Sequence, residues 1–141
     1  VFSHFLYLVE RFLGSATLID AAAVYQSDPA LCETHVSATL DCDGVPVKLL
    51  GSSGGVGPDR VEMTIWGSKS SHRLHDWFEL QVSDGGEWQQ QLSEHGDLRV
   101  DSFRRQLDGV AAWLAGADHP LASAADALSV QVLVEDILAD S

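Results

Sequence analysis

The clearest hydrophobic pattern in the chain is an alternation from Val36 to Leu50, interrupted by the dipeptide Asp43-Gly44. This dipeptide predicts a two-residue hairpin turn, because both central positions of a type I′ turn need a positive φ, which Asp and Gly tolerate. A turn there pairs apolar side chains on one face of the hairpin, namely Cys42 with Val45, Leu40 with Val47 and Ala38 with Leu49. The other face pairs Thr39 with Lys48 and Ser37 with Leu50. Because a hairpin with one apolar face is unstable alone, we expect further strands to extend it and helices to cover it.

An amphipathic helix is predicted for residues 2–13, where apolar side chains recur at steps of three and four and Gly14 follows as a C-cap. His4, Tyr7 and Arg11 recur at the same steps along the other side of this helix. These three side chains either line a cleft together or form an exposed polar face. The spacing alone favours the exposed face.

Further strands are predicted at residues 17–26, 60–67, 78–82 and 87–92, with Val61, Met63 and Ile65 pointing inward and Glu62, Thr64 and Trp66 outward. The glycine-rich stretch 51–58 resembles a phosphate-binding loop only superficially. Such loops lead into a helix, whereas Pro58 leads into a predicted strand. We therefore interpret this stretch as a flexible connection.

Two helices are predicted towards the end of the chain. Asp101 is expected to cap the first, whose core stripe is Phe103, Leu107, Val110 and Leu114 and which ends at Gly116. A capping box from Ser123 to Asp126 opens the second, which is apolar nearly all round and is expected to be wedged between other elements. The predicted fold class is α+β, with a mainly antiparallel open sheet of five or six strands and helices covering one face.

Composition narrows the range of partners. The 141 residues are 45% hydrophobic, which suits one domain, and eight basic against 21 acidic residues give a formal charge of −13. This charge repels phosphate backbones and anionic lipids, so we expect no nucleic acid and no membrane partner. No apolar run approaches the roughly 20 residues of a bilayer span and no signal peptide is visible, so we expect a cytoplasmic protein. The start at Val1, without methionine, suggests a fragment.

Metal and nucleophile sites find little support in the sequence. His72 and His75 are three apart on a predicted strand and therefore point to opposite faces, and Cys32 and His35 have no second ligand pair downstream. We expect no metal. Cys32 and Cys42 are expected to be reduced thiols, because they lack C-x-x-C spacing and Cys42 points inward on the hairpin. No G-x-S-x-G motif occurs.

The outward sheet face carries two large apolar side chains, Leu50 and Trp66, among polar neighbours. A mixed face of this kind is typical of an interface between proteins. Isolated apolar residues on a surface are equally common, so the pattern alone leaves both interpretations open.

Three parts of the chain together resemble the second domain of the Gfo/Idh/MocA oxidoreductases. They are His4 to Gly14, Val61 to Leu74, and a closing pair of segments at residues 101–110 and 120–138. In that family a histidine is followed ten positions later by glycine, a strand, glycine turn and strand come next, and a pair of helices closes the domain. The family is named for glucose-fructose oxidoreductase and inositol dehydrogenase. The likeness spans nearly the whole chain.

The resemblance implies that residues 1–141 are the C-terminal domain of an oxidoreductase whose N-terminal Rossmann domain is absent from this chain. Neither a G-x-G-x-x-G fingerprint nor the family's Glu-Lys-Pro segment occurs. The implied activity is NAD(P)-dependent oxidation or reduction of a sugar, polyol or related hydroxy compound. NAD or NADP would be bound mainly by the missing domain, so this fragment alone is expected to hold no cofactor and to be inactive.

By the same resemblance, His4 matches the family's catalytic histidine, which helps to move the proton of a substrate hydroxyl. Tyr7 and Arg11 are expected to line the substrate cleft, and Leu50 and Trp66 to lie in a homo-oligomer interface on the open sheet face. Phe2 stands where the family usually has glycine. This departure favours a first alternative, a non-catalytic binding or scaffold domain of the same fold, and a second alternative is an independent small-ligand module.

Overall fold

The computed structural model describes residues 2–28, 30–91 and 96–139, and the chain divides into two compact units. Unit 1 comprises Val1–Val56 and Ala122–Ser141, and unit 2 comprises Gly57–Leu121. Three helices and two antiparallel sheets make up the described part, which confirms the α+β class. None of the described helices is long and apolar enough to cross a bilayer.

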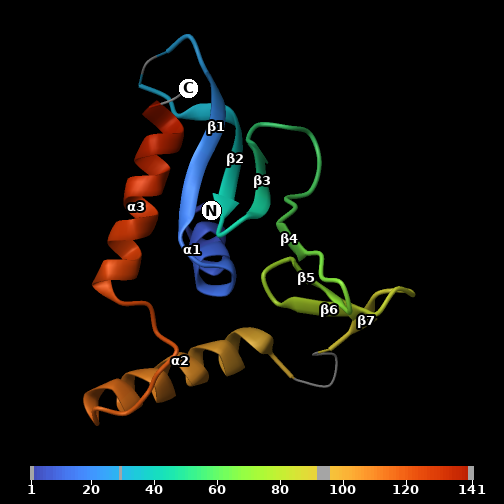
Figure 1. The fold of residues 1–141 in the computed structure, drawn as a ribbon, viewed down its shortest axis with the longest axis vertical. Helices are drawn as coiled ribbons and strands as arrows, with labels where there is room; N and C mark the ends of the chain where they lie inside the picture. Colours follow the sequence, from blue (N-terminus) through green and yellow to red (C-terminus); the bar gives the residue numbers. More distant parts are fainter. Residues whose placement is uncertain (1, 29, 92–95, 140–141) are drawn as a thin grey trace. The chain divides into compact units, whose positions relative to one another are not determined.

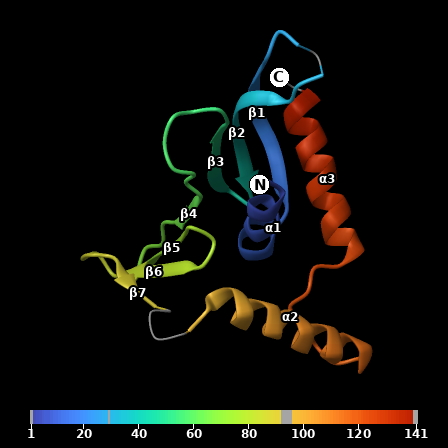
Figure 2. The same cartoon turned by 180° about the vertical axis from the view of Figure 1, so that it is seen from behind.

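Unit 1 is a three-stranded antiparallel sheet with two helices (Figure 1). Its elements are α1 (Phe2–Leu13), β1 (Ala16–Tyr25), β2 (Glu33–Cys42), β3 (Val45–Ser52) and α3 (Ala124–Ala139). The strand order is β1-β2-β3, so β1 and β3 are the edges. Helix α3 runs beside β1, as the front and back views both show (Figures 1 and 2).

The hairpin of β2 and β3 has the predicted register. Asp43 and Gly44 form the turn with φ of 52° and 86°, and the predicted partners, from Cys42 with Val45 to Ser37 with Leu50, face each other. On the outer face, Lys48 Nζ donates to Thr39 Oγ1 at 2.6 Å. The alternation of apolar and polar residues therefore places one face towards the helices and the other towards solvent.

The core of unit 1 lies between the sheet and the two helices. Helix α1 contributes Leu6, α3 contributes Val130, Leu133 and Ile137, and the strands contribute Ala21, Val36, Ala38, Leu40 and Leu49. Helices thus cover one face of this sheet, as predicted. The capping box of α3 is also confirmed, because Asp126 Oδ2 accepts from Ser123 N and Oγ, both at 2.7 Å, and Asp126 N donates to Ser123 Oγ.

Helix α3 is less enclosed than its apolar sequence suggests. Its buried residues share one side, whereas Leu128 and Val132 are exposed. The prediction that α3 is wedged between elements is therefore wrong for the outer side of the helix.

Unit 2 contains a four-stranded antiparallel sheet and one helix. The strands β4 (Glu62–Ile65), β5 (Ser71–His75), β6 (Glu79–Ser83) and β7 (Gln89–Gln90) pair in chain order. The described strands therefore form two sheets, of three and four strands, where the sequence suggested one of five or six. Leu92, the predicted end of the last strand, lies outside the described residues.

Helix α2 (Leu98–Leu114) differs from the prediction in its start and in its packing. It begins one turn earlier, capped by Asp97, whose side chain accepts from Arg99 N at 3.0 Å, so Asp101 lies inside the helix. The predicted core stripe is exposed, with Phe103 at 61% and Leu114 at 80%. The buried residue of this helix is Gly109, against which Leu121 packs.

Candidate functional site

Helix α1 positions the three side chains that the sequence singled out. Phe5, Leu6 and Val9 are buried, so the helix turns its other side outward, where His4 and Arg11 are exposed. Tyr7 lies between them and is half-buried, because it packs against the core of unit 1. The predicted stripe therefore exists, with an aromatic ring anchored at its centre and an imidazole and a guanidinium at its two ends.

A small cavity lies beside the first turn of α1. Its volume is about 290 Å³, and it is lined by Phe2 and Ser3 together with apolar residues of β2, β3 and α3. Glu33 and Gln131 add polar groups to this wall. His4 follows directly after Phe2 and Ser3, although neither His4, Tyr7 nor Arg11 lines the cavity. The structure thus has a hollow at the start of α1 that the side chains of the predicted stripe do not line.

The start of α1 is held against β3 by a close contact. A Cβ on Gly51 would lie 2.3 Å from Cζ of Phe2, far closer than carbon atoms approach, so the phenyl ring occupies the space that a side chain would need. This contact gives Phe2 a packing role at the position where the resemblance leads one to expect glycine.

A second and larger hollow lies at the other end of α1. This β1–α3 groove, with a volume of about 840 Å³, is lined by Glu10, residues 16–19 of β1, and the side of α3 that carries Ser129, Val132 and Asp136. Glu10 joins the three elements, because its Oε1 accepts from Ser129 Oγ at 3.1 Å and from Ala16 N at 3.4 Å. The sequence pattern did not predict this groove. The sequence feature that points to it is Glu10, the single carboxylate of the largely apolar helix α1.

Two ionisable groups of unit 1 have shifted pKa values. The pKa of Asp126 is lowered, first by the Ser123 backbone N–H, then by the Ser123 hydroxyl and to a smaller extent by the charge of Arg11. The pKa of the Cys42 thiol is raised, first by burial and then by the charges of Asp41, Glu10 and Asp43. Cys42 is therefore a protonated, buried thiol, which is a poor nucleophile. Cys32 is exposed, and both cysteines are free thiols.

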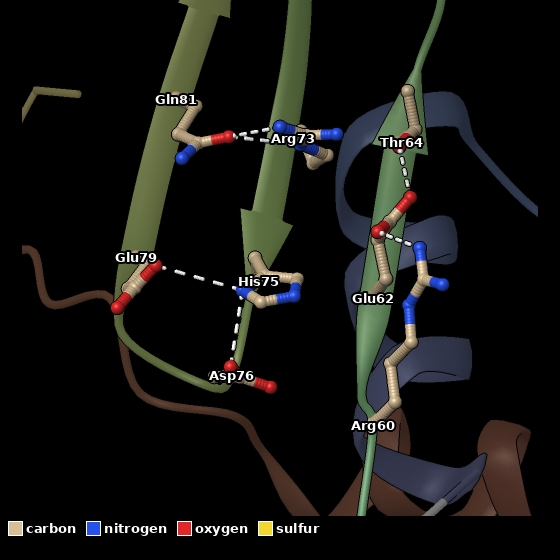
Figure 3. A network of polar contacts seen from close by, with 8 residues as sticks. All are labelled: Arg60, Glu62, Thr64, Arg73, His75, Asp76, Glu79 and Gln81. Atoms are coloured by element: carbon tan, nitrogen blue, oxygen red, sulfur yellow. Dashed lines mark hydrogen bonds and ion pairs between the residues drawn. The ribbon is translucent and has the colours of Figure 1, made fainter. Parts of the chain in front are cut away.

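The polar side chains of unit 2 contact one another along residues 60–64 and between β5 and β6 (Figure 3). Arg60 pairs with Glu62 at 2.8 Å, and this hydrogen bond is the main reason why the pKa of Glu62 is lowered. Both Nε and Nη2 of Arg73 donate to Gln81 Oε1. These partners are on neighbouring strands or two residues apart, which indicates that the network stabilises the sheet.

The histidines of β5 have separate partners. His72 contacts Ser70 Oγ at 3.3 Å, and His75 Nδ1 lies 3.1 Å from Asp76 and 3.5 Å from Glu79 (Figure 3). Among residues 2–28, 30–91 and 96–139 no group of three or more metal-ligating side chains is arranged to hold a metal ion.

Leu50 and Trp66 are both exposed but belong to different units. Leu50, 82% exposed, projects from the outer face of β3. Trp66, 78% exposed, follows β4 and meets the Trp88 ring edge-on at a centroid distance of 5.9 Å. The Arg73 guanidinium stacks over Trp88 at 4.5 Å. Each residue therefore marks a surface of its own, and the one in unit 2 combines two indoles with a cation.

The glycine-rich loop between β3 and β4 differs from a dinucleotide-binding loop. The glycine-rich loop after Gly51 contains Gly54 and Gly57 with positive φ, but it leads to strand β4 and offers no helix N-terminus for a pyrophosphate.

The sequence matches no protein-family model and no curated protein. The structure is similar to a dehydrogenase (MviM) from Clostridium difficile, with a TM-score of 0.79, 12% identity, and coverage of 99% of this chain and 46% of that one. It is also similar to an oxidoreductase from Agrobacterium radiobacter in complex with NAD+, L-tartaric acid and magnesium, with a TM-score of 0.72, 18% identity, and coverage of 99% and 45%. A third similar structure is the WlbA dehydrogenase from Bordetella pertussis in complex with NADH and UDP-GlcNAcA, with a TM-score of 0.70, 16% identity, and coverage of 98% and 43%.

These matches concern the fold, which is the one expected from the resemblance to Gfo/Idh/MocA oxidoreductases. The chain spans less than half the length of each of these three proteins.

Proposed function

We propose that residues 1–141 form the C-terminal substrate-binding and oligomerisation domain of an NAD(P)-dependent oxidoreductase that acts on a sugar, a polyol or a related hydroxy compound. The observation that carries this proposal is the likeness of 98–99% of the chain to dehydrogenases and oxidoreductases, two of them in complexes with NAD+ or NADH. L-tartaric acid and UDP-GlcNAcA, held in those two complexes, both carry hydroxyl groups.

His4 is the residue to which we assign acid–base chemistry. It lies exposed in the first turn of α1 and follows Phe2 and Ser3, two of the residues that line the 290 Å³ cavity. An imidazole changes protonation near neutral pH, which suits it to take or return the proton of a substrate hydroxyl. Tyr7 and Arg11, on the same side of α1, offer a phenol and a guanidinium to other substrate hydroxyl or carboxylate groups.

The dinucleotide would be bound mainly by a Rossmann domain that residues 1–141 do not contain, because this chain has no glycine fingerprint and its glycine-rich loop leads into strand β4. Residues 1–141 alone are therefore expected to be inactive.

A panel of sugars, polyols and hydroxy acids, offered with NAD or NADP to the full-length protein, tests the proposal. We expect at least one hydroxy compound to reduce the nicotinamide, detected by its absorbance, and residues 1–141 alone to show no turnover with the same panel. A full-length protein that binds the compounds without turnover would instead support the non-catalytic scaffold, which Phe2 favours because it stands where the family usually has glycine.

We also propose that the protein is a homo-oligomer in which Leu50 and Trp66 are interface residues. Tryptophan and arginine are the residues most enriched at the energetic centres of interfaces, and Trp66, Trp88 and Arg73 adjoin one another. Trp66→Glu is expected to lower the apparent mass on size-exclusion chromatography, because a charge replaces an indole at the contact. Val56→Glu, at a fully exposed loop position, is the matched control and should leave elution unchanged. If Trp66→Glu elutes like the unmodified protein, the interface assignment is wrong.

A further inference from the structure

The cavity beside the first turn of α1 contains a carboxylate that has no partner within the described part of the chain. This cavity, of about 290 Å³, lies within unit 1 and is lined by α1, β2, β3 and α3. Glu33 of β2 supplies the one ionisable side chain among the described lining residues, and none of them pairs with it. His4, Tyr7 and Arg11 do not line the cavity, so a ligand bound there is separate from the acid–base chemistry proposed above.

Gln131 of α3 adds a second hydrogen-bond acceptor to the lining. Its Nε2 donates to Glu135 Oε1 at 2.9 Å, one turn along the helix. The amide oxygen of Gln131 has no hydrogen bond to the described residues, so it is available to accept one. Ser3 contributes a hydroxyl, which can accept or donate. A carboxylate and an amide oxygen both accept, so the polar part of the lining suits a ligand that brings N–H donors and a positive charge.

The rest of the lining is apolar. Phe2 of α1 and Val134 and Leu138 of α3 line the cavity and are partly exposed, so a ligand can reach their side chains. Mostly apolar walls with a few polar groups are typical of small-molecule sites. An apolar cavity of about 150 Å³ can hold benzene. The 290 Å³ present here therefore has room for a phenyl ring with a short chain attached.

We propose that this cavity binds a small primary ammonium compound with an apolar body. The ammonium group pairs with Glu33 and donates to the amide oxygen of Gln131. The apolar body contacts Phe2, Val134 and Leu138. A hydrogen bond between two charged groups is about twice as strong as one between neutral groups, so the carboxylate selects an amine over an alcohol of the same shape. The formal charge of −13 attracts any cation to the protein, and the experiment must separate that attraction from binding in the cavity.

Calorimetric titration of the full-length protein, without nicotinamide or hydroxy substrate, tests the proposal. The probes are 2-phenylethylamine, 2-phenylethanol and 3-phenylpropanoate, which share a phenyl ring and differ in the charge of the head group. We expect saturable binding of the amine with a Kd on the order of 1 mM or lower. The alcohol should bind at least about tenfold more weakly, and the carboxylate should not bind. Absence of saturable amine binding, or equal binding of the alcohol, would overturn the proposal.

Two neutralising substitutions separate the cavity from the general charge of the protein. Glu33→Gln keeps the shape of the side chain and removes its charge, so it is expected to weaken the amine about tenfold or more and to leave the alcohol unchanged. Glu87→Gln removes one charge at an exposed position of unit 2 and should weaken the amine less than about twofold. Equal losses in the two variants would mean that the amine responds to net charge alone, and the proposal would be wrong.

A substitution that fills the cavity tests where the ligand lies. Val134→Phe places a larger side chain in the lining and is expected to weaken the amine and the alcohol together. Val132→Phe, on an exposed position of the same helix and outside this lining, is the matched control and should leave both unchanged. If folded Val134→Phe binds the amine as the unmodified protein does, the ligand lies elsewhere and the proposal fails. If Val134→Phe does not fold, Glu33→Gln decides the outcome.

Discussion

His4→Ala in the full-length protein is expected to lower turnover by about 10²- to 10⁴-fold, the contribution typical of a positioned general acid or base. His4 is exposed, so its truncation should leave the unfolding free energy nearly unchanged. The effect should fall on kcat more than on KM, because proton transfer stabilises the transition state.

His35→Ala is the control for this experiment. His35 is an exposed histidine of β2 in the same unit, and its Nδ1 contacts Thr34 Oγ1. Its removal should leave kcat unchanged. If His4→Ala turns over substrate at the rate of the unmodified protein, the acid–base assignment fails, while the description of the fold is unaffected.

Leu40→Ala is expected to lower the free energy of unfolding by about 2–5 kcal/mol, as large-to-small changes in a core do. Leu40 is completely buried in β2, where it belongs to the cluster that joins the sheet to α1 and α3. Truncation loses its apolar contacts and leaves a cavity that the paired strands cannot close. Urea unfolding followed by circular dichroism measures the change.

Leu128→Ala removes the same atoms from an exposed position of α3 and should change stability by less than about 0.5 kcal/mol. Equal effects of the two substitutions would mean that Leu40 is not part of a packed core.

Local chemistry explains which parts of the fold were predictable. The Asp43-Gly44 turn sets the register of β2 and β3, and the Ser123–Asp126 box sets the start of α3, because both depend on residues within a few positions of each other. The predicted start of α2 was wrong, because Asp97 and Asp101 are one helical turn apart and each is a suitable N-cap residue.

Long-range packing explains what was not predictable. Periodicity shows that Phe103 and Leu114 share a stripe of α2, but it does not show whether anything covers that stripe. Alternation likewise identifies strands without revealing that β1–β3 and β4–β7 pair as separate sheets.

The candidate functional site also has one part that the sequence predicts and one that it does not. The stripe of His4, Tyr7 and Arg11 follows from helical spacing within α1. The β1–α3 groove brings together Glu10 and Asp136, which are far apart in sequence, so only the packing of α3 beside β1 reveals it.

The discontinuity of unit 1 has a consequence for biosynthesis. The sheet β1–β3 is translated early, but the side chains that close its core, such as Leu133 and Ile137, emerge only after all of unit 2 has been made. Until α3 is synthesised, only α1 can cover the apolar face of this sheet, so part of that face stays exposed on the nascent chain and could bind a chaperone during that interval.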